Sequence, residues 1–468
     1  MDLLSYPQKR PGIFYAVLAI PILIFLNILY VPFHAPDDYD HFKRAYSLVH
    51  ANIWPLTESG KNSGGYVDSG LADMVEFQRQ VIFLPHRETT LAMRWAGEVG
   101  APALPVFRWS HAKVYSEYPG SSSYLPLIYL PQAFAVWAGE QLDLSVNTTV
   151  LAARLFNGLS AVTIIAWVLS RLPFGAAIVL AVLLLPKTLL QFASNSADPL
   201  IHAISLAIIA AAVSGLIGRS APGFRQYLLM AFGLLVLLGV RPPLLPFALL
   251  PFALAVVSRN RWGGLVVVAS VLLALAWFAM ALPAVTDLRC GPAGSLVAKA
   301  QEFVVHGPML IVQSFRSRLH YYVTSFIGEL GWGNGPDGTI VGLPTWVYVS
   351  ALAMLAIAAV HDVAQPSRLA PRYRFMLALC AAGVVVLIFF VMYGGCTPPG
   401  SDVIRGVQGR YLVSPLLLLV PAIAGLLPRR IAVPGMLGLC LLAFAAANVM
   451  VLAVEGYRLY GWNWHIIG

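Results

Sequence analysis

The stretch IFYAVLAIPILIFLNILYVPFHAPDDYDHF, residues 13–42, joins a long apolar run to a dense group of ionisable side chains. Residues 13–33 are numerous enough to cross the roughly 30 Å hydrocarbon core of a bilayer as an α-helix. Lys9 and Arg10 precede this run and no small-residue cleavage site follows it, so we expect a first helix that stays in the protein. The stretch predicts a membrane protein with charged chemistry where its first helix leaves the membrane.

The composition of the whole chain agrees with this prediction. Of 468 residues, 59% are hydrophobic and 11% are charged, which is far too apolar for a soluble globular protein. The net charge of +9 does not indicate a nucleic-acid partner, because cationic loops orient membrane proteins by lying on the cytoplasmic side. Four cysteines exclude a disulfide-dense scaffold, and no CxxC or HExxH metal spacing occurs.

Repeated apolar runs predict an all-α polytopic membrane protein with about eleven transmembrane helices in one integral membrane domain, residues 1–468. The predicted spans are 13–33, 150–170, 174–193, 199–217, 226–240, 244–258, 262–283, 344–361, 374–393, 411–427 and 431–453. Two long polar stretches remain, a first outer loop at 34–149 and a second at 284–343. We expect the first loop to contain amphipathic or re-entrant helices.

The orientation depends on one ambiguous segment, YLPLIYLPQAFAVWAG at residues 124–139. It is apolar enough to cross, but Pro126 and Pro131 interrupt it, and proline removes a backbone donor from a helix. If this segment does not cross, every short basic loop falls on the side of the N-terminus, as the positive-inside rule requires. We therefore expect a cytoplasmic N-terminus and both long loops outside.

This orientation brings several ionisable residues to the outer level of the membrane. Four of them are cations: Arg154, Lys187, Arg241 and Arg410. A charge near the bilayer centre costs roughly 2.5–3.5 kcal/mol on insertion scales, so such residues require a reason. One reason is that each long side chain extends to the interface. The other, which the shared level favours, is a polar cavity that binds the anionic headgroup of a lipid phosphate.

The acidic residues in the same region are candidates for a general base. Asp37 is the favoured base and Asp38 the other candidate; the alternative for Asp37 is an N-cap of the helix that begins near Asp38. His41 follows both by one helical turn, so it could orient the base, help to hold a divalent metal, or be a plain interfacial histidine. Asp198, in SNSADP, has either a turn role or an active-site role.

Two further motifs lie in predicted outer segments. IGELGWGNGPDG, residues 327–338, offers Glu329 and Trp332 as sugar contacts, with interfacial anchoring as the alternative for Trp332. GVQGRY, residues 406–411, presents Gln408 and Arg410 at the entry of a span, where an arginine suits phosphate. No Walker or GxSxG motif is present, which leaves nucleotide-driven transport and hydrolase chemistry without support.

The motifs PDDYDHFKRAY, YLPLIYLPQA, AARLFNGLS, QFASNSADPL, GELGW and GVQGRY occur in this order. Together they resemble a family of bacterial polytopic membrane proteins placed in the GT-C glycosyltransferase superfamily, over roughly residues 13–450. The resemblance implies a polyprenyl-phosphate sugar donor and an outward-facing site with acidic residues at Asp37 or Asp38 and at Asp198. The family's first motif usually reads Asp-Glu where this chain has Asp37-Asp38, so which carboxylate is the base stays open.

We therefore expect a glycosyltransferase at the outer face of a bacterial inner membrane that transfers a sugar to an envelope glycan, lipid or protein. The alternatives are a flippase or transporter of lipid-linked saccharides, and an envelope glycan ligase or polymerase. Cys290 and Cys396 both fall in predicted outer loops, where an oxidising compartment favours a disulfide if the two are within reach. Two free thiols are the alternative.

Overall fold

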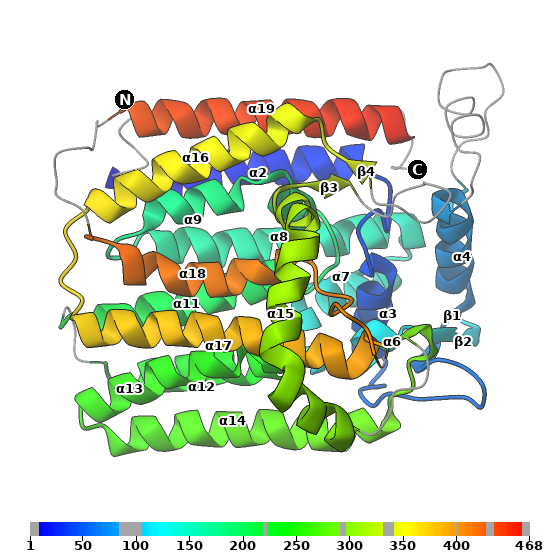
Figure 1. Cartoon of the computed structure of the whole chain (residues 1–468). Helices are drawn as coiled ribbons and strands as arrows, with labels where there is room; N and C mark the ends of the chain where they lie inside the picture. The colour runs from blue at the N-terminus through cyan, green and yellow to red at the C-terminus, as the bar shows by residue number, and fades with distance from the viewer. Residues whose placement is uncertain are drawn as a thin grey trace.

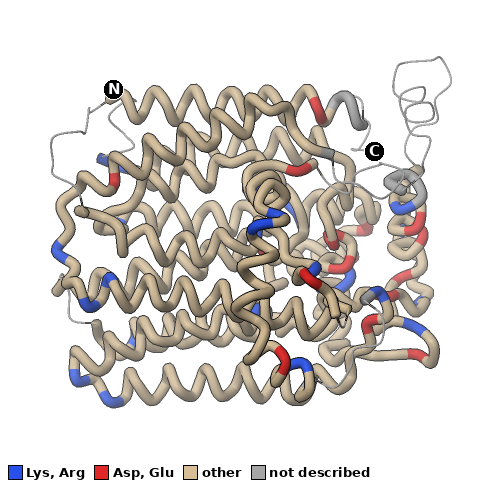
Figure 2. The backbone as a smooth tube through the Cα atoms, viewed as in Figure 1, with Lys and Arg blue, Asp and Glu red and all other residues tan. Residues whose placement is uncertain are grey.

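The computed structural model describes residues 9–83, 105–218, 222–290, 296–330, 341–398, 400–426 and 435–460. Most helices run side by side along one axis, and α3 (Asp38–Val49), α4 (Ser69–Phe83) and the strands β1 and β2 gather at one end of this bundle (Figure 1). We call this the α3 end. Figure 2 shows acidic residues concentrated toward the α3 end, whereas Lys and Arg dominate the opposite end.

Seven helices among the described residues are long and apolar enough to cross a membrane. They are α2 (Pro11–Leu29), α8 (Val146–Leu169), α11 (Asp198–Leu216), α14 (Arg261–Ala281), α16 (Thr345–Ala364), α17 (Pro371–Cys396) and α19 (Met436–Tyr460). Shorter apolar helices occupy the other predicted spans: α9 (Ala176–Leu183) with α10 (Pro186–Phe192), α12 (Phe224–Leu238), η3 (Pro242–Ala248) with α13 (Leu249–Val257), and η6 (Gly409–Leu412) with α18 (Val413–Ile423). The membrane class is confirmed, and the count of eleven stays a prediction.

The third predicted span is broken in a way that positions the site. Pro186 begins α10 after Leu185 leaves the helical conformation, and Lys187 is consequently in the first turn of α10. Gly158 of α8 lets this region pack closely, because a Cβ atom there would lie 2.4 Å from the carbonyl oxygen of Phe192. The short turn between α10 and α11 is thereby held against α8.

Residues 34–149, the predicted first outer loop, contain more structure than the sequence predicts. β1 (Gly64–Asp68) pairs antiparallel with β2 (Lys113–Glu117), so the description all-α needs a small correction. The short helices α6 (Pro119–Ser122) and η2 (Pro126–Tyr129) lead into α7 (Leu130–Gln141). With 12 residues, α7 is about 18 Å long and too short to cross a bilayer. Its exposed residues Leu130, Phe134 and Trp137 follow helical spacing and form one apolar face.

The predicted second outer loop contains the long helix α15 (Leu296–Ile327), which was not predicted from the sequence. Figure 1 shows that α15 runs across the other helices rather than along them. Two 3-10 turns, η4 (Leu282–Ala284) and η5 (Leu288–Cys290), precede α15, and the antiparallel pair β3 (Glu329–Leu330) and β4 (Val341–Gly342) follows it. Several apolar side chains of α15 are strongly exposed: Val297, Val304, Val305, Met309, Val312 and Leu319. Exposed apolar side chains on a helix that crosses the bundle are typical of a helix in the membrane interface.

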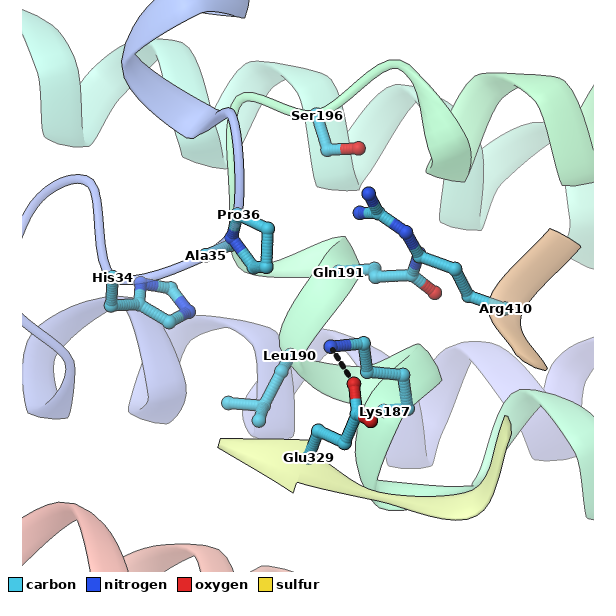
Figure 3. Close-up of a pocket in the computed structure, with 9 residues that line it drawn as sticks. All are labelled: His34, Ala35, Pro36, Lys187, Leu190, Gln191, Ser196, Glu329 and Arg410. Atoms are coloured by element: carbon cyan, nitrogen blue, oxygen red, sulfur yellow. Dashed lines mark ion pairs between the residues drawn. The ribbon is translucent and has the colours of Figure 1, made fainter. Parts of the chain in front are cut away.

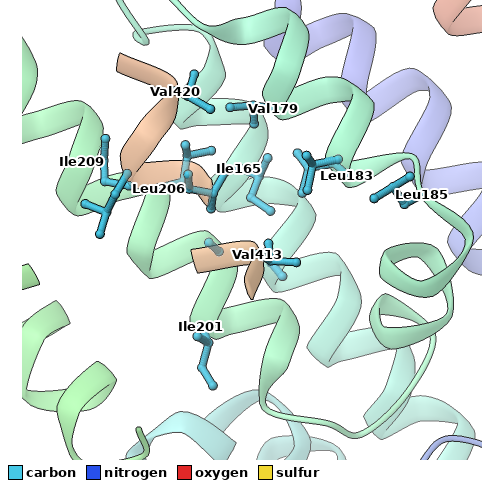
Figure 4. Packing of buried hydrophobic residues seen from close by; sticks show 14 of the residues in the cluster. Ile165, Val179, Leu183, Leu185, Ile201, Leu206, Ile209, Val413 and Val420 are labelled. Atoms are coloured by element: carbon cyan, nitrogen blue, oxygen red, sulfur yellow. The ribbon is translucent and has the colours of Figure 1, made fainter. Parts of the chain in front are cut away.

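The interior of the bundle is packed with buried aliphatic side chains from helices distant in sequence. Leu183 of α9, Leu206 of α11 and Val413 of α18 lie in one continuous cluster (Figure 4). Cys380 and Cys440 are free thiols in helices, whereas Cys396 is disulfide-bonded. Its predicted partner, Cys290, has a side chain outside the described part of the structure, so the pairing stays a prediction.

Candidate functional site

Asp37 occupies the N-cap position of α3 without capping the helix by its side chain. Its φ of +60° is a left-handed conformation that a residue other than glycine adopts at a cost. The carboxylate points to cations instead, with Oδ2 3.6 Å from Nη2 of Arg410 and Oδ1 3.8 Å from Nη1 of Arg289. The N-cap alternative is therefore right for the position of Asp37, but its side chain makes no capping hydrogen bond.

Asp198 is the second carboxylate at which predicted site residues meet. It begins α11, and its side chain is only 2% exposed. Arg241, just before η3, forms an ion pair with Oδ1, while Nη1 of Arg410 lies 3.5 Å from Oδ2. The amide of Gln191 donates to the same Oδ2. Three segments that are far apart in the sequence thus converge on one acidic side chain.

A small cavity lies between Lys187, Glu329 and Arg410, next to the segment that leads to Asp37 (Figure 3). Nζ of Lys187 is 3.5 Å from Oε2 of Glu329, and both side chains are buried. Burial raises the pKa of the Glu329 carboxyl, and the positive charge of Lys187 opposes that shift. The cavity measures about 10 Å³, which is about the space that a single water molecule requires. The site is closed in this conformation.

Asp38 and His41 lie behind these groups. Asp38 is fully buried, and its Oδ1 accepts a 2.6 Å hydrogen bond from the backbone N–H of Asn195. Burial raises the pKa of Asp38 to about 6, although Arg154 acts in the opposite direction. Nδ1 of His41 is 2.6 Å from the Tyr129 hydroxyl, and burial lowers the pKa of His41 to about 4. His41 is therefore neutral at pH 7.

Arg154 is the predicted site residue whose contacts favour a structural role. Its Nε donates to the carbonyl of Ala193, and its Nη1 donates to those of Tyr30 and Val31. The side chain is completely buried and joins the end of α2 to the turn between α10 and α11. Arg154 does not line the cavity, and backbone carbonyls rather than a phosphate accept from its Nε and Nη1.

Two site residues were missed by the sequence reading. Asp40 is 1% exposed, and its Oδ2 lies 3.8 Å from Nη1 of Arg289, which η5 supplies from the second outer loop. Arg289 also pairs with Asp287 at 2.7 Å. Asp40 follows Asp37 by three residues, so helical spacing could have placed it on the same face. No signal in the sequence connects Arg289 to them.

Gln408 and Trp332 are the remaining predicted residues, and Gln408 is not among the residues that line the cavity. Gln408 is half-buried at the N-cap position of η6, directly before the cavity-lining segment. Trp332 lies outside the described residues. Within the described ranges, no group of three or more His, Cys, Asp or Glu side chains is placed to hold a metal ion. The charged groups described at the site are cations paired with carboxylates.

The comparisons with known proteins give one match. A family model described as a predicted membrane protein (DUF2142) covers residues 21–420. No curated protein and no solved structure matches the chain. The matched range extends from α2 to α18 and includes every residue of the cavity.

Proposed function

We propose that this chain, which belongs to the DUF2142 family of predicted membrane proteins, is a GT-C-like inverting glycosyltransferase with a polyprenyl-phosphate sugar donor. The observation that carries the proposal is the position of Lys187 and Arg410 at one cavity, beside the partly exposed carboxylate of Asp37. Buried cations suit a lipid phosphate, and a nearby carboxylate suits deprotonation of an acceptor hydroxyl.

The proposal includes the cellular setting. The site would face the outside of a bacterial inner membrane, the N-terminus would be cytoplasmic, and eleven segments would cross. The acceptor would be an envelope glycan, lipid or protein. The basic residues that dominate the end opposite the site support this orientation under the positive-inside rule (Figure 2).

Asp37 is the better base of the two adjacent aspartates. Its side chain is 30% exposed and lies next to Arg410. Asp38 is fully buried and holds the N–H of Asn195, so an acceptor hydroxyl has no route to its carboxylate without a rearrangement. We therefore assign proton removal to Asp37 and positioning of the turn before α11 to Asp38.

The reaction follows from these roles. The acceptor oxygen forms a bond to the anomeric carbon of the sugar while Asp37 takes the hydroxyl proton. The bond from that carbon to the phosphate oxygen breaks, and its electron pair leaves with the polyprenyl phosphate. Lys187 and Arg410 stabilise the resulting negative charge. Asp198 holds Arg410 and Arg241 in place through ion pairs.

The closed cavity implies a movement before the donor binds. A sugar phosphate cannot enter about 10 Å³, so at least one lining group must be displaced. Glu329 occupies the position of an anion at Lys187, and β3, which carries it, forms only a two-residue pairing with β4. We expect the donor phosphate to replace the Glu329 carboxylate at Lys187.

A transporter of lipid-linked saccharides would need a path to both sides of the membrane. The bundle between the cavity and the opposite end is packed with buried apolar side chains such as Leu183, Leu206 and Val179 (Figure 4). This packing favours a one-sided enzyme over the transporter.

The test is sugar transfer by the purified chain in detergent, where no second compartment exists. A panel of radiolabelled polyprenyl-phosphate sugars is incubated with an envelope extract as the acceptor source. Label should move to the acceptor, and Asp37→Asn should reduce this transfer at least about a hundredfold, the usual scale for a general base. Asp38→Asn should retain most of it.

The matched control is Asp73→Asn, which changes an exposed aspartate on α4 of the same outer loop. It should transfer sugar at the wild-type rate. If no donor of the panel supports transfer, or if Asp37→Asn is as active as Asp73→Asn, the glycosyltransferase proposal is wrong.

A further inference from the structure

A second, larger hollow lies on the side of the bundle formed by α13 and α14, at the end opposite the cavity. It measures about 470 Å³ and is lined along its length by apolar side chains, among them Phe252 and Val256 of α13 and Leu265 and Val268 of α14. All four of these side chains are exposed. In Figure 1 both helices lie at the edge of the bundle, so in a bilayer their exposed apolar side chains would face lipid. We call this hollow the α13–α14 groove.

Cations close one end of the groove. Arg259 and Arg261 flank Asn260 in the tight connection between the two helices, and all three residues line the groove. The connection is fixed, because the side chain of Asn260 accepts a hydrogen bond from the N–H of Gly263. Within the described part of the chain, neither arginine makes an ion pair, and Arg261 lies only over the ring of Trp262.

We propose that the α13–α14 groove binds an anionic phospholipid. One acyl chain lies along the apolar wall between the two helices, and the phosphate pairs with Arg259 and Arg261. The arrangement reproduces the polarity of such a lipid, with an apolar length that ends at a pair of cations. A water-soluble ligand would leave the apolar wall without a partner. This site is separate from the cavity at Lys187 and does not depend on the proposed function.

The test measures lipid binding by native mass spectrometry of the full chain. Phosphatidylglycerol and phosphatidylcholine are titrated separately into the detergent-solubilised protein. Phosphatidylglycerol should bind more tightly, and the double variant Arg259→Gln/Arg261→Gln should weaken its binding about thirtyfold, because each interfacial arginine contributes about a factor of five. Equal binding of the two lipids would overturn the proposal.

The matched control is Arg171→Gln/Arg225→Gln, which removes two arginines that follow α8 and begin α12 at the same end of the bundle. Both lie outside the groove lining. This pair should bind phosphatidylglycerol within about twofold of wild type if each charge acts only locally. A loss as large as that of the groove pair would mean a general surface charge effect and would overturn the site.

A second variant tests the acyl chain without touching a charge. A Cβ atom at Gly264 would meet only the Cβ of Ala255, at an ordinary 3.7 Å, so Gly264→Leu should fold and extend its side chain into the groove. With unchanged thermal stability, it should weaken phosphatidylglycerol binding at least about tenfold. Unchanged binding would overturn the proposed position of the acyl chain in the groove. Displacement of the lipid by inorganic phosphate would show that the arginines bind a soluble anion instead.

Discussion

Nη2 of Arg410 lies 3.6 Å from Oδ2 of Asp37, although the two residues come from opposite ends of the chain. The same guanidinium reaches Asp198 with its other terminal nitrogen, Nη1. A planar group with several fixed donors can address two carboxylates at once, whereas the single ammonium of a lysine acts as one point charge. Arg410 therefore joins the predicted base to the second acidic residue of the site.

Arg410→Lys should keep the positive charge but lose the simultaneous contact with Asp37 and Asp198. We expect polyprenyl phosphate to bind about ten- to a hundredfold more weakly, because one ammonium cannot hold the donor and both carboxylates. Equilibrium binding of fluorescent polyprenyl phosphate checks this. Arg405→Lys, at an exposed arginine of the same loop, is the control. Equal affinities of the two variants would remove Arg410 from the donor site.

The buried ion pair of Lys187 and Glu329 can be dissected by a double-mutant cycle. Lys187→Met alone leaves Glu329 buried without its cation, which should destabilise the protein by about 3–5 kcal/mol. The double variant Lys187→Met/Glu329→Gln should recover most of the thermal stability, since neither charge remains. Sugar transfer should stay low in both variants. If the double variant lost as much melting temperature as the two single variants Lys187→Met and Glu329→Gln together, the two side chains would not form a direct pair.

The pH dependence of stability should reflect the burial of His41. Burial lowers its pKa to about 4, against an ordinary value of 6.5. The unfolded chain therefore binds a proton that the folded chain does not, and stability falls as the pH drops from about 6.5 to about 4. His41→Asn, which can keep the hydrogen bond to Tyr129, should lessen this fall in melting temperature. His111→Asn, at an exposed loop histidine, should leave the slope unchanged.

The orientation can be tested with reporters fused near two described turns. A reporter near Asp143, after α7, should be external, and one near Gln365, after α16, should be cytoplasmic. The reason is that α7 is too short to cross, so the basic loops stay on the side of the N-terminus. Reporters on the same side of the membrane would contradict the alternation of spans on which the shared site depends.

The sequence predicted the seven long apolar helices well, because lipid-facing helices must be apolar over their whole length. Proline and charge counting also predicted that residues 124–139 do not cross, and the 12 residues of α7 agree. The helix α15 escaped this reasoning, since an amphipathic helix across the bundle lacks a continuous apolar run and includes Pro308. Hydropathy reports which residues can enter lipid, and says little about helices that lie along it.

The sequence predicted that several ionisable residues would lie together, and the roles of these residues stay predictions. The motifs predicted that Asp37, Asp198 and Arg410 lie at the same end of the spans, and the structure brings the three side chains together. The backbone partners of Arg154 could not be predicted, because hydrogen bonds to carbonyls of distant turns leave no pattern in side-chain types. Arg289 was missed for a similar reason: its contacts with Asp37 and Asp40 depend on where a long loop folds back.

Gly409, next to Arg410, has no space for a side chain, because a Cβ atom there would lie 2.1 Å from the carbonyl oxygen of Tyr322 in α15. Its N–H also donates to the hydroxyl of Ser325 in the same helix. Backbone contact this close holds the cation against the last turns of α15, which follow a kink at Arg318. Since the part of α15 before this kink lies across the bundle with exposed apolar side chains, we expect the level of Arg410 to depend on the depth of that part in the lipid and on the angle of the kink. Leaflet thickness would then tune the alignment of the cation with lipid headgroups, without any change of residue.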